Sequence, residues 1–463
     1  MTPLHHLKRS LVTLLALGLI LLVSLFVVRS LAGLGTQPAT TAVSTSSTTA
    51  LSTGIPETTL WATNTPQGQE GVKPATPNPP TELLPTGKRP PACTFPLADI
   101  KPVESQPETY TFSEPRIVLT SETAIGIASW LPDSERLLIT RQSQNGRQTI
   151  ETINYRTGET KIYAEREGEN GKPIWLSELD AIAYATDVQG HYELWISDGG
   201  VQEKKNAMVV SDVSGWSLAS DGKELVYFSP AIGEIPQIWN LSTNSFQDSG
   251  VNLSIWEYPK FQSDLLPLTR GLTFSTALQP HGTNVAFYGR GWFFLLDKKA
   301  SQVCEVDLEQ YGVLSVLRAS WSPNGRYIAM IVTPNPPGEL ASSSNILVLD
   351  LYSGKMYRPM LESPVVRDIA WADDSQYLAG LVADPVEFKQ GSPRSRIYLI
   401  HIFGDVVAKE ISTQLYGGGA TNGWLLAWSP NGKSIAVKCP SWIEMEPTID
   451  EDHIFIMEVY ARP

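Results

Sequence analysis

The chain has 463 residues, of which 42% are apolar and 18% charged, and it contains 13 Trp, 35 Gly and 34 Pro. So much glycine and proline favours many short strands joined by turns over long helices. The net charge of −13 argues against a general nucleic-acid-binding protein, and three cysteines are too few for a disulfide-rich scaffold or most zinc modules.

The N-terminal segment predicts a single transmembrane helix. Residues 11–28 carry no charged side chain, and their length is near the lower limit for crossing a hydrocarbon core of about 30 Å. Because Lys8 and Arg9 precede this run, residues 1–10 are expected to form a short cytoplasmic tail, with the rest of the chain outside the cell membrane. The alternative is a signal peptide cleaved near residue 32, which would leave a secreted or periplasmic protein.

Residues 36–92 are rich in Thr, Pro and Ser and have no apolar periodicity. A segment of this composition cannot bury enough apolar surface to offset the loss of chain entropy on folding. We therefore predict a disordered linker that holds residues 93–463 away from the membrane.

One sequence pattern recurs seven times after the linker, and its clearest copy is ASWSPNGRYIAMI at residues 319–331. Each copy combines a short apolar strand, a turn and an alternating strand, at intervals near the 40–50 residues of a four-stranded propeller blade. The pattern predicts an all-β fold, a seven-bladed β-propeller of four-stranded blades. A bulky residue ends the first strand of each copy and is expected to pack between blades: Trp130, Trp175, Leu218, Leu278, Trp321, Trp371 and Trp428.

The ends of the repeat array predict how the ring closes. The last copy supplies only three strands, whereas residues 116–120 (RIVLT) form a strand-like run before the first copy. We expect this run to become the outer strand of the seventh blade, because an open ring would leave two strand edges free to pair with other chains.

The turn sequences resemble those of a known repeat. Ser322-Pro323-Asn324-Gly325 and residues 429–432 (SPNG), each followed by an Ile-Ala strand, are similar to the repeat of the TolB-type, WD-like β-propeller family. The resemblance implies the propeller fold for about 350 residues. The chain departs from TolB itself, because the small α/β domain that precedes the propeller in TolB is replaced by the predicted membrane segment and linker. The partner-binding role of TolB is therefore not carried over with the fold.

The three cysteines leave two alternatives open. Cys93 precedes the closing strand and Cys439 belongs to the seventh copy, whereas Cys304 belongs to the fourth. We expect either a Cys93–Cys439 disulfide, which an oxidising compartment would permit, or three free thiols.

No motif of a serine hydrolase, a metalloprotease or a phosphate-binding loop occurs in the sequence. We therefore expect no cofactor and no metal. The first hypothesis is a non-enzymatic, membrane-tethered scaffold that binds a protein or a cell-envelope polymer. The alternative is a hydrolase or lyase whose site is built from loops at the propeller channel.

A candidate partner-binding surface follows from loop lengths. The connections between second and third strands lengthen in the last three copies, on one predicted face of the ring, and loops on a rigid scaffold often carry binding sites. The aromatic and acidic side chains of this surface would suit a basic partner: Trp442, Glu444, Glu446, Asp450, Glu451 and Asp452, with Tyr416 on a neighbouring loop. The alternative is a solvated acidic loop with Trp442 packed into the blade edge.

Overall fold

The computed structural model describes most of the region that contains the repeats. The described residues are 90–97, 109–142, 147–167, 172–188, 191–199, 206–211, 219–229, 235–251, 275–280, 282–289, 292–334, 344–359, 365–383, 395–403, 409–411, 425–440 and 452–462. The predicted tail (1–10), the membrane segment (11–28) and the linker (36–92), apart from its last three residues, lie outside them. Within the described ranges, no helix is both long and apolar enough to cross a membrane.

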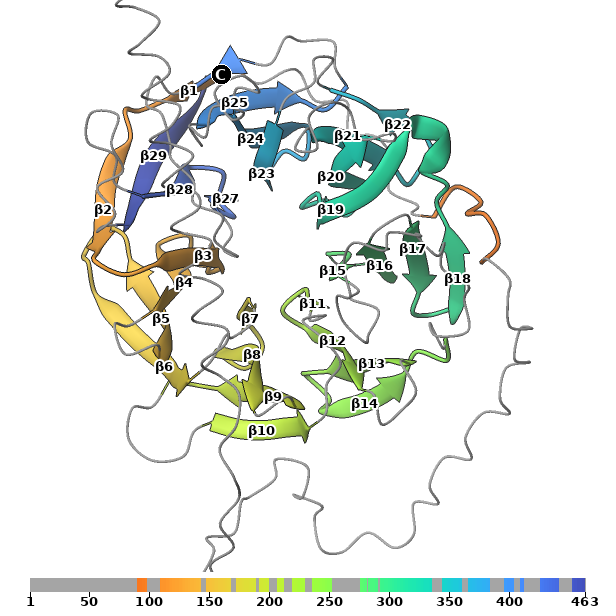
Figure 1. Ribbon diagram of the computed structural model, residues 1–463, viewed down its shortest axis with the longest axis horizontal. Helices are drawn as coiled ribbons and strands as arrows, with labels where there is room; N and C mark the ends of the chain where they lie inside the picture. The colour runs from red at the N-terminus through yellow and green to blue at the C-terminus, as the bar shows by residue number, and fades with distance from the viewer. Residues whose placement is uncertain are drawn as a thin grey trace, which may run out of the picture. The chain divides into compact units, whose positions relative to one another are not determined.

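Seven antiparallel sheets follow one another around a ring, which confirms the predicted seven-bladed propeller (Figure 1). Each of the first six blades contains four consecutive strands, and the first strand of each lies nearest the centre of the ring. The strands of blades 1–4 are β3 (Ile125–Trp130), β4 (Arg136–Gln142), β5 (Arg147–Asn154), β6 (Thr160–Glu167); β7 (Ile174–Leu176), β8 (Ala181–Val188), β9 (His191–Ser197), β10 (Asn206–Ser211); β11 (Ala219–Ser220), β12 (Glu224–Ser229), β13 (Ile235–Asn240), β14 (Ser245–Asp248); and β15 (Ser275–Leu278), β16 (Asn284–Gly289), β17 (Trp292–Asp297), β18 (Gln302–Glu305).

Blades 5–7 complete the ring. Their strands are β19 (Val313–Trp321), β20 (Tyr327–Pro334), β21 (Asn345–Asp350), β22 (Met356–Tyr357); β23 (Val365–Trp371), β24 (Tyr377–Ala383), β25 (Ser395–His401), β26 (Lys409–Glu410); and β27 (Leu426–Trp428), β28 (Ser434–Pro440), β29 (Asp452–Arg462). A short 3-10 turn, η4 (Glu309–Tyr311), lies between blades 4 and 5.

Two N-terminal strands complete blade 7. Strand β2 (Arg116–Ser121) pairs antiparallel with the first half of β29, as predicted for residues 116–120. A second strand that the sequence did not reveal, β1 (Thr109–Phe112), pairs with the last four residues of β29, so that Thr109 lies opposite Arg462. The ring is therefore closed by the two ends of the propeller chain.

The bulky residues that end the inner strands pack between blades. Trp130, Trp321, Trp371 and Leu278 are buried, whereas Trp175 is partly buried and Leu218 lies outside the described residues. The indole N–H of Trp321 donates to Ala277 O in blade 4 (2.9 Å), and that of Trp371 to Ser320 O in blade 5 (3.0 Å). Trp428 is also buried, but its N–H donates to Gly432 O within its own turn (3.0 Å).

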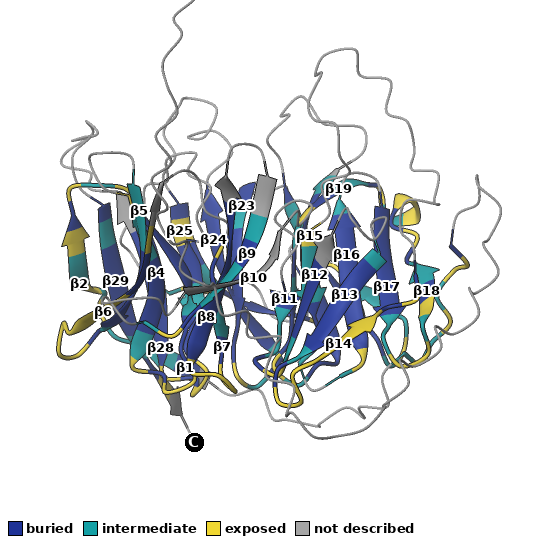
Figure 2. Cartoon of the chain, turned by 90° about the horizontal axis from the view of Figure 1, so that it is seen from below, coloured by how far each residue is buried: buried dark blue, intermediate teal, exposed yellow. Residues whose placement is uncertain are grey.

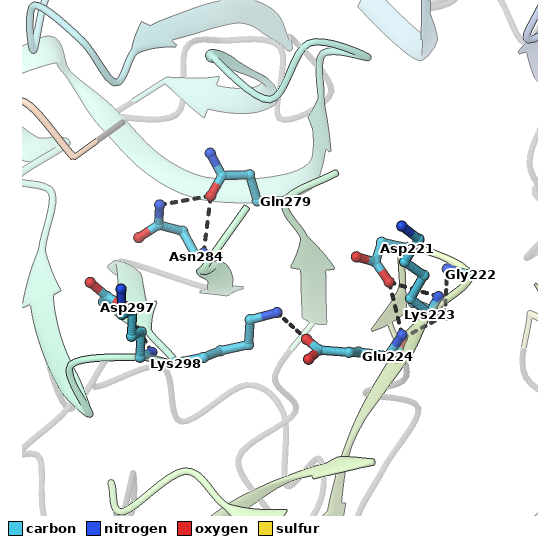
Figure 3. Close-up of polar contacts among 10 residues, drawn as sticks. Asp221, Gly222, Lys223, Glu224, Gln279, Asn284, Asp297 and Lys298 are labelled. Atoms are coloured by element: carbon cyan, nitrogen blue, oxygen red, sulfur yellow. Dashed lines mark hydrogen bonds and ion pairs between the residues drawn. The ribbon is translucent and has the colours of Figure 1, made fainter. Parts of the chain in front are cut away.

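The turns between the first and second strands of blades 3, 5 and 7 contain glycine at a position that favours it. Gly222, Gly325 and Gly432 all have positive φ, between 72° and 89°, a conformation that favours glycine. In the turn of blade 3, Asp221 Oδ1 accepts hydrogen bonds from the N–H groups of Lys223 and Glu224, both at 2.9 Å (Figure 3). The carboxylate of Glu224 in turn pairs with Lys298 of blade 4 (Figure 3).

Burial follows the strands. Buried residues fill the middle strands of the blades, and exposed residues gather at the turns and on outer strands such as β2 and β14 (Figure 2). The cores form between neighbouring blades: one, for example, combines Phe293 of blade 4 with Trp321 and Ile328 of blade 5.

The N-terminal segment 90–97 corrects the predicted disulfide. Cys93 is bonded to Cys304 in β18, not to Cys439. The prediction failed because it placed Cys93 near blade 7 on the grounds that it precedes the closing strands. Instead, Cys93 N–H donates to Glu305 O (3.0 Å) and Leu97 N–H to Leu351 O (2.8 Å), which places the segment beside β18 of blade 4 and the β21–β22 turn of blade 5.

Candidate binding face

The connections between the second and third strands are longest in three consecutive blades, as predicted. In blades 5, 6 and 7 the second and third strands are joined by residues 335–344, 384–394 and 441–451, whereas in blades 1–4 the corresponding connections are 143–146, 189–190, 230–234 and 290–291. We define the loop face by the strand ends that flank the three long connections: Pro334, Asn345, Ala383, Ser395, Pro440 and Asp452.

Contacts between blades show that the connections from one blade to the next emerge on the same face. Ser344, directly before β21, forms a parallel bridge with Val365 at the start of β23. Its hydroxyl donates to Val366 O (2.8 Å) and is buried. The base of the 335–344 connection is therefore fastened to the inner strand of blade 6.

The candidate partner-binding residues fall into two groups. Trp442, Glu444, Glu446, Asp450, Glu451 and Tyr416 lie outside the described residues. Asp452 is described, and the prediction that it belongs to an exposed acidic surface is wrong, because only 9% of the residue is exposed. It is the first residue of β29 and pairs with Pro440 at the end of β28.

Asp452 instead belongs to a buried ion pair at the junction of blades 7 and 1. Its Oδ2 atom lies 3.0 Å from Nζ of Lys438, a side chain that is only 1% exposed. The same oxygen accepts the N–H of Ile125, the first residue of β3 (2.9 Å), and Lys438 N–H donates to Leu425 O (2.8 Å). A buried charge needs such partners, and this pair holds both strand ends that flank residues 441–451.

A second buried ion pair joins blades 5, 6 and 7. Arg318 of β19 contacts Asp368 of β23, which is 1% exposed. Asp368 Oδ2 also accepts the N–H groups of Leu425 (2.7 Å) and Leu426 (2.9 Å) at the start of blade 7. Burial lowers the pKa of the Arg318 guanidinium to about 9, so it stays protonated at neutral pH.

The local backbone directs these two side chains. Strand β19 has a bulge between Val316 and Arg318, and β23 has one between Val366 and Asp368. A bulge inserts an extra residue into a strand and changes the direction of the next side chain. The polar contacts extend into blade 4 through Tyr288, which hydrogen-bonds with the Ala319 backbone and whose pKa is raised by burial.

Sequence reasoning missed Arg318, Asp368 and Lys438, although a signal existed for the first two. Arg318 and Asp368 each precede the marker tryptophan of their blade by three residues (Trp321 and Trp371). Opposite charges at the same repeat position of consecutive blades lie close together in a ring. No comparable signal exists for Lys438, which sits in an alternating strand like an exposed residue.

The two buried ion pairs support the loop face structurally. In each ion pair the carboxylate also accepts backbone N–H groups of a neighbouring blade, so the two pairs fix the bases of connections on the loop face. Among the residues that the structure describes, no three His, Cys, Asp or Glu side chains form a group that could hold a metal ion.

Comparisons with known proteins give structural matches only. No protein-family model and no curated protein matches the sequence. An oligogalacturonate lyase in complex with manganese aligns over 77% of this chain and 97% of its own, with 11% identity and a TM-score of 0.53. This match supports the propeller fold.

Two further propellers align less closely. TolB from Acinetobacter baumannii has 14% identity and a TM-score of 0.37 over 60% of this chain, and the match spans 61% of its own length. The C-terminal WD40 domain of Sif2 has 12% identity and a TM-score of 0.41, over 76% of this chain and 99% of its own.

Proposed function

We propose that this chain is a membrane-tethered scaffold outside the cytoplasm that binds a protein or a cell-envelope polymer through the loop face of blades 5–7, without catalysing a reaction. The observation that carries the proposal is the anchoring of that face. Ser344, Asp368 and Asp452 fasten the bases of the connections to neighbouring blades. Variable loops on rigid supports are a common arrangement at binding sites.

Charge favours a basic partner. Residues 93–463 hold 29 Lys and Arg against 45 Asp and Glu, and the 441–451 connection contributes Glu444, Glu446 and Asp450 beside Trp442. An aromatic anchor surrounded by carboxylates suits a basic protein segment or a cation-bearing polymer, since charge accelerates the encounter and the buried ring supplies affinity.

The disulfide supports the location. Cys93–Cys304 is expected to form and persist in an oxidising compartment, as for secreted and cell-surface proteins. A cytoplasmic propeller would be exposed to a reducing thiol pool, so the bond argues for a position outside the cytoplasm.

The binding proposal is tested by crosslinking capture with the full chain. Replacing Trp442, Glu444 and Glu446 by Ala should weaken capture of the partner about tenfold or more, the loss typical of an aromatic hot spot. Added salt should weaken capture by the wild type more than by the variant, because it screens the removed charges.

A matched control removes one exposed aromatic ring and two exposed carboxylates elsewhere, by Phe246→Ala, Glu135→Ala and Glu159→Ala. This variant should capture as the wild type does. Equal capture by the loop variant and the wild type would move the binding surface away from these loops. Release of shorter products from oligogalacturonate or another polymer, with or without manganese, would overturn the non-enzymatic part of the proposal.

The location is tested by adding protease to intact cells. The propeller should be released by cuts within residues 36–92, while a cytoplasmic marker stays whole. Protection of the propeller under conditions that cut an outward-facing control would refute the orientation. A chain that starts near residue 33 and is not attached to cells would establish the secreted alternative.

A further inference from the structure

The path of the chain brings its N-terminal part to blades 4 and 5 before it reaches the strands that close the ring. Residues 90–97 lie beside β18, where Glu305 N–H donates to Pro91 O (2.8 Å). The side-chain amide of Asn284 donates to Leu97 O (3.2 Å). Only after this segment does the chain enter β1 and β2 in blade 7.

The closing strands are vulnerable to a pull from the N-terminal side. Within the described ranges, β1 and β2 pair only with β29 and no strand covers their outer edge. Tension arriving at Thr109 would separate the pairs one at a time, beginning with Thr109 and Arg462 and ending with Ser121 and Asp452. Breaking hydrogen bonds in sequence needs far less force than breaking them together.

Loss of β1 would also open the core. Tyr110 is 4% exposed, its hydroxyl donates to Asp374 Oδ2 (2.8 Å), and its ring meets Trp428 edge-on at a centroid distance of 5.7 Å. Peeling this strand away therefore removes side chains that join blades 6 and 7.

The disulfide prevents tension on the N-terminal segment from reaching the closing strands. Cys93 is covalently joined to Cys304, so tension in the preceding 92 residues passes into blade 4 and leaves residues 94–303 inside a closed covalent loop. Cys304 lies within β18 (Gln302–Glu305), and both ends of β18 continue into the fold. Force that enters at Cys304 acts on the interior of β18, and this strand has no free end from which its hydrogen bonds could be broken one at a time.

We propose that the Cys93–Cys304 disulfide is a mechanical clamp that transfers load on the N-terminal segment to blade 4 and shields the strands that close the ring. The inference deepens the proposed tethering, because a tethered scaffold that holds a partner on blades 5–7 is loaded between those blades and its N-terminal segment. In the absence of the clamp, the same load would open blade 7 first.

Single-molecule force spectroscopy on the full chain in detergent tests the clamp. One handle is placed at the N-terminus and the other at an unnatural amino acid replacing the exposed Lys433 in the turn of blade 7. After reduction of the folded molecule, a first low-force event should release the 28 residues 94–121, an extension of about 100 Å at ~3.6 Å per residue.

The oxidised chain should lack this event. Its final extension should also be shorter by the sequence separation of 211 between the two cysteines, which corresponds to about 760 Å at ~3.6 Å per residue. A ~100 Å low-force event in the oxidised chain, or its absence from the reduced chain, would overturn the proposal.

Two variants complete the test. Cys439→Ser keeps the disulfide and should behave as the wild type in both states. The Cys93→Ser/Cys304→Ser double variant should show the low-force event without reductant, and in situ reduction of the wild type makes the result independent of how well this variant folds. Failure of the protease test on cells would refute the membrane tether and leave these force measurements unchanged, so the two proposals fail separately.

Discussion

Buried charges in this propeller are held by several partners at once, and the Arg326–Asp350 pair of blade 5 shows the principle clearly. Both side chains are almost fully buried, and the guanidinium donates to the two carboxylate oxygens from Nε (2.8 Å) and Nη2 (2.7 Å). Burial by itself raises the pKa of Asp350, but hydrogen bonds, chiefly those from Arg326, outweigh it, so that the pKa lies below the ordinary value of 3.8.

We expect Asp350→Asn to lower the free energy of unfolding by about 3–5 kcal/mol at pH 7, since it leaves a buried guanidinium without its counter-charge. A carboxyl group whose pKa is depressed on folding contributes stability above its unfolded pKa, and this contribution is lost as the pH falls through the folded pKa. The difference between wild type and variant should therefore be constant from pH 7 to about pH 4 and shrink below it.

Urea denaturation at a series of pH values measures this difference. Asp133→Asn is the control, because Asp133 and its partner Arg136 are each about one-third exposed and such surface pairs contribute less than about 1 kcal/mol. A pH-independent difference for Asp350→Asn would mean that the charge of Asp350 is not the source of the stability.

At the scale of the strand, closure depends more on β1 than its four residues suggest. Tyr110 of β1 is buried against Trp428 and Tyr377, whereas Ile117 of β2 is 51% exposed. Pairing with β29 is common to both strands, so Tyr110 and Ile117 differ in what their side chains bury.

Tyr110→Ala should therefore destabilise the propeller by about 3–5 kcal/mol, the range for truncating a large buried aromatic residue. Ile117→Ala should change stability by less than about 1 kcal/mol, because the side chain already faces solvent. Thermal unfolding followed by circular dichroism measures both. A similar loss for the two variants would assign closure to backbone pairing alone.

The elements of the fold could be predicted from the sequence because their signals are local. The turn at Asn324-Gly325 and the alternating strand after it occupy adjacent residues, and each of the seven copies became one blade. Strand β1 was missed because TYTF is a run of only four residues that lies outside the repeats. Its pairing depends on the continuation of β29 beyond the position where β2 begins.

The candidate site was harder to predict because it depends on where distant segments meet. Asp452 follows Asp450 and Glu451 in sequence, so composition placed it in a solvated acidic loop. The groups that bind the Asp452 carboxylate, Lys438 and the Ile125 N–H, come from other strands. The prediction of the disulfide partner of Cys93 failed for the same reason. Residues 90–97 lie outside the repeats, so no periodic pattern in the sequence indicates which blade they contact.

At the scale of the molecule, the disulfide also restrains the unfolded chain. It joins residues separated by 211 positions, and the chain-entropy model assigns about 5 kcal/mol to closing a loop of that length. Reduction should therefore lower the urea midpoint of the wild type markedly. Cys439→Ser, which keeps the bond, should have the midpoint of the wild type in both the oxidised and the reduced state. An unchanged midpoint would mean that the 90–97 segment is held by its backbone hydrogen bonds alone.

The pairing of Thr109 with Arg462 means that the propeller has no intrinsic first blade. A linker of a few residues from Arg462 to Thr109 would join β29 to β1 as a hairpin. The chain could then be opened at another connection between blades. Seven circular permutants would share one set of blade contacts and differ in which blade the two ends of the chain complete. The natural order is distinguished among them by the position of Cys93, which ties the N-terminal segment to blade 4 on the way to blade 7.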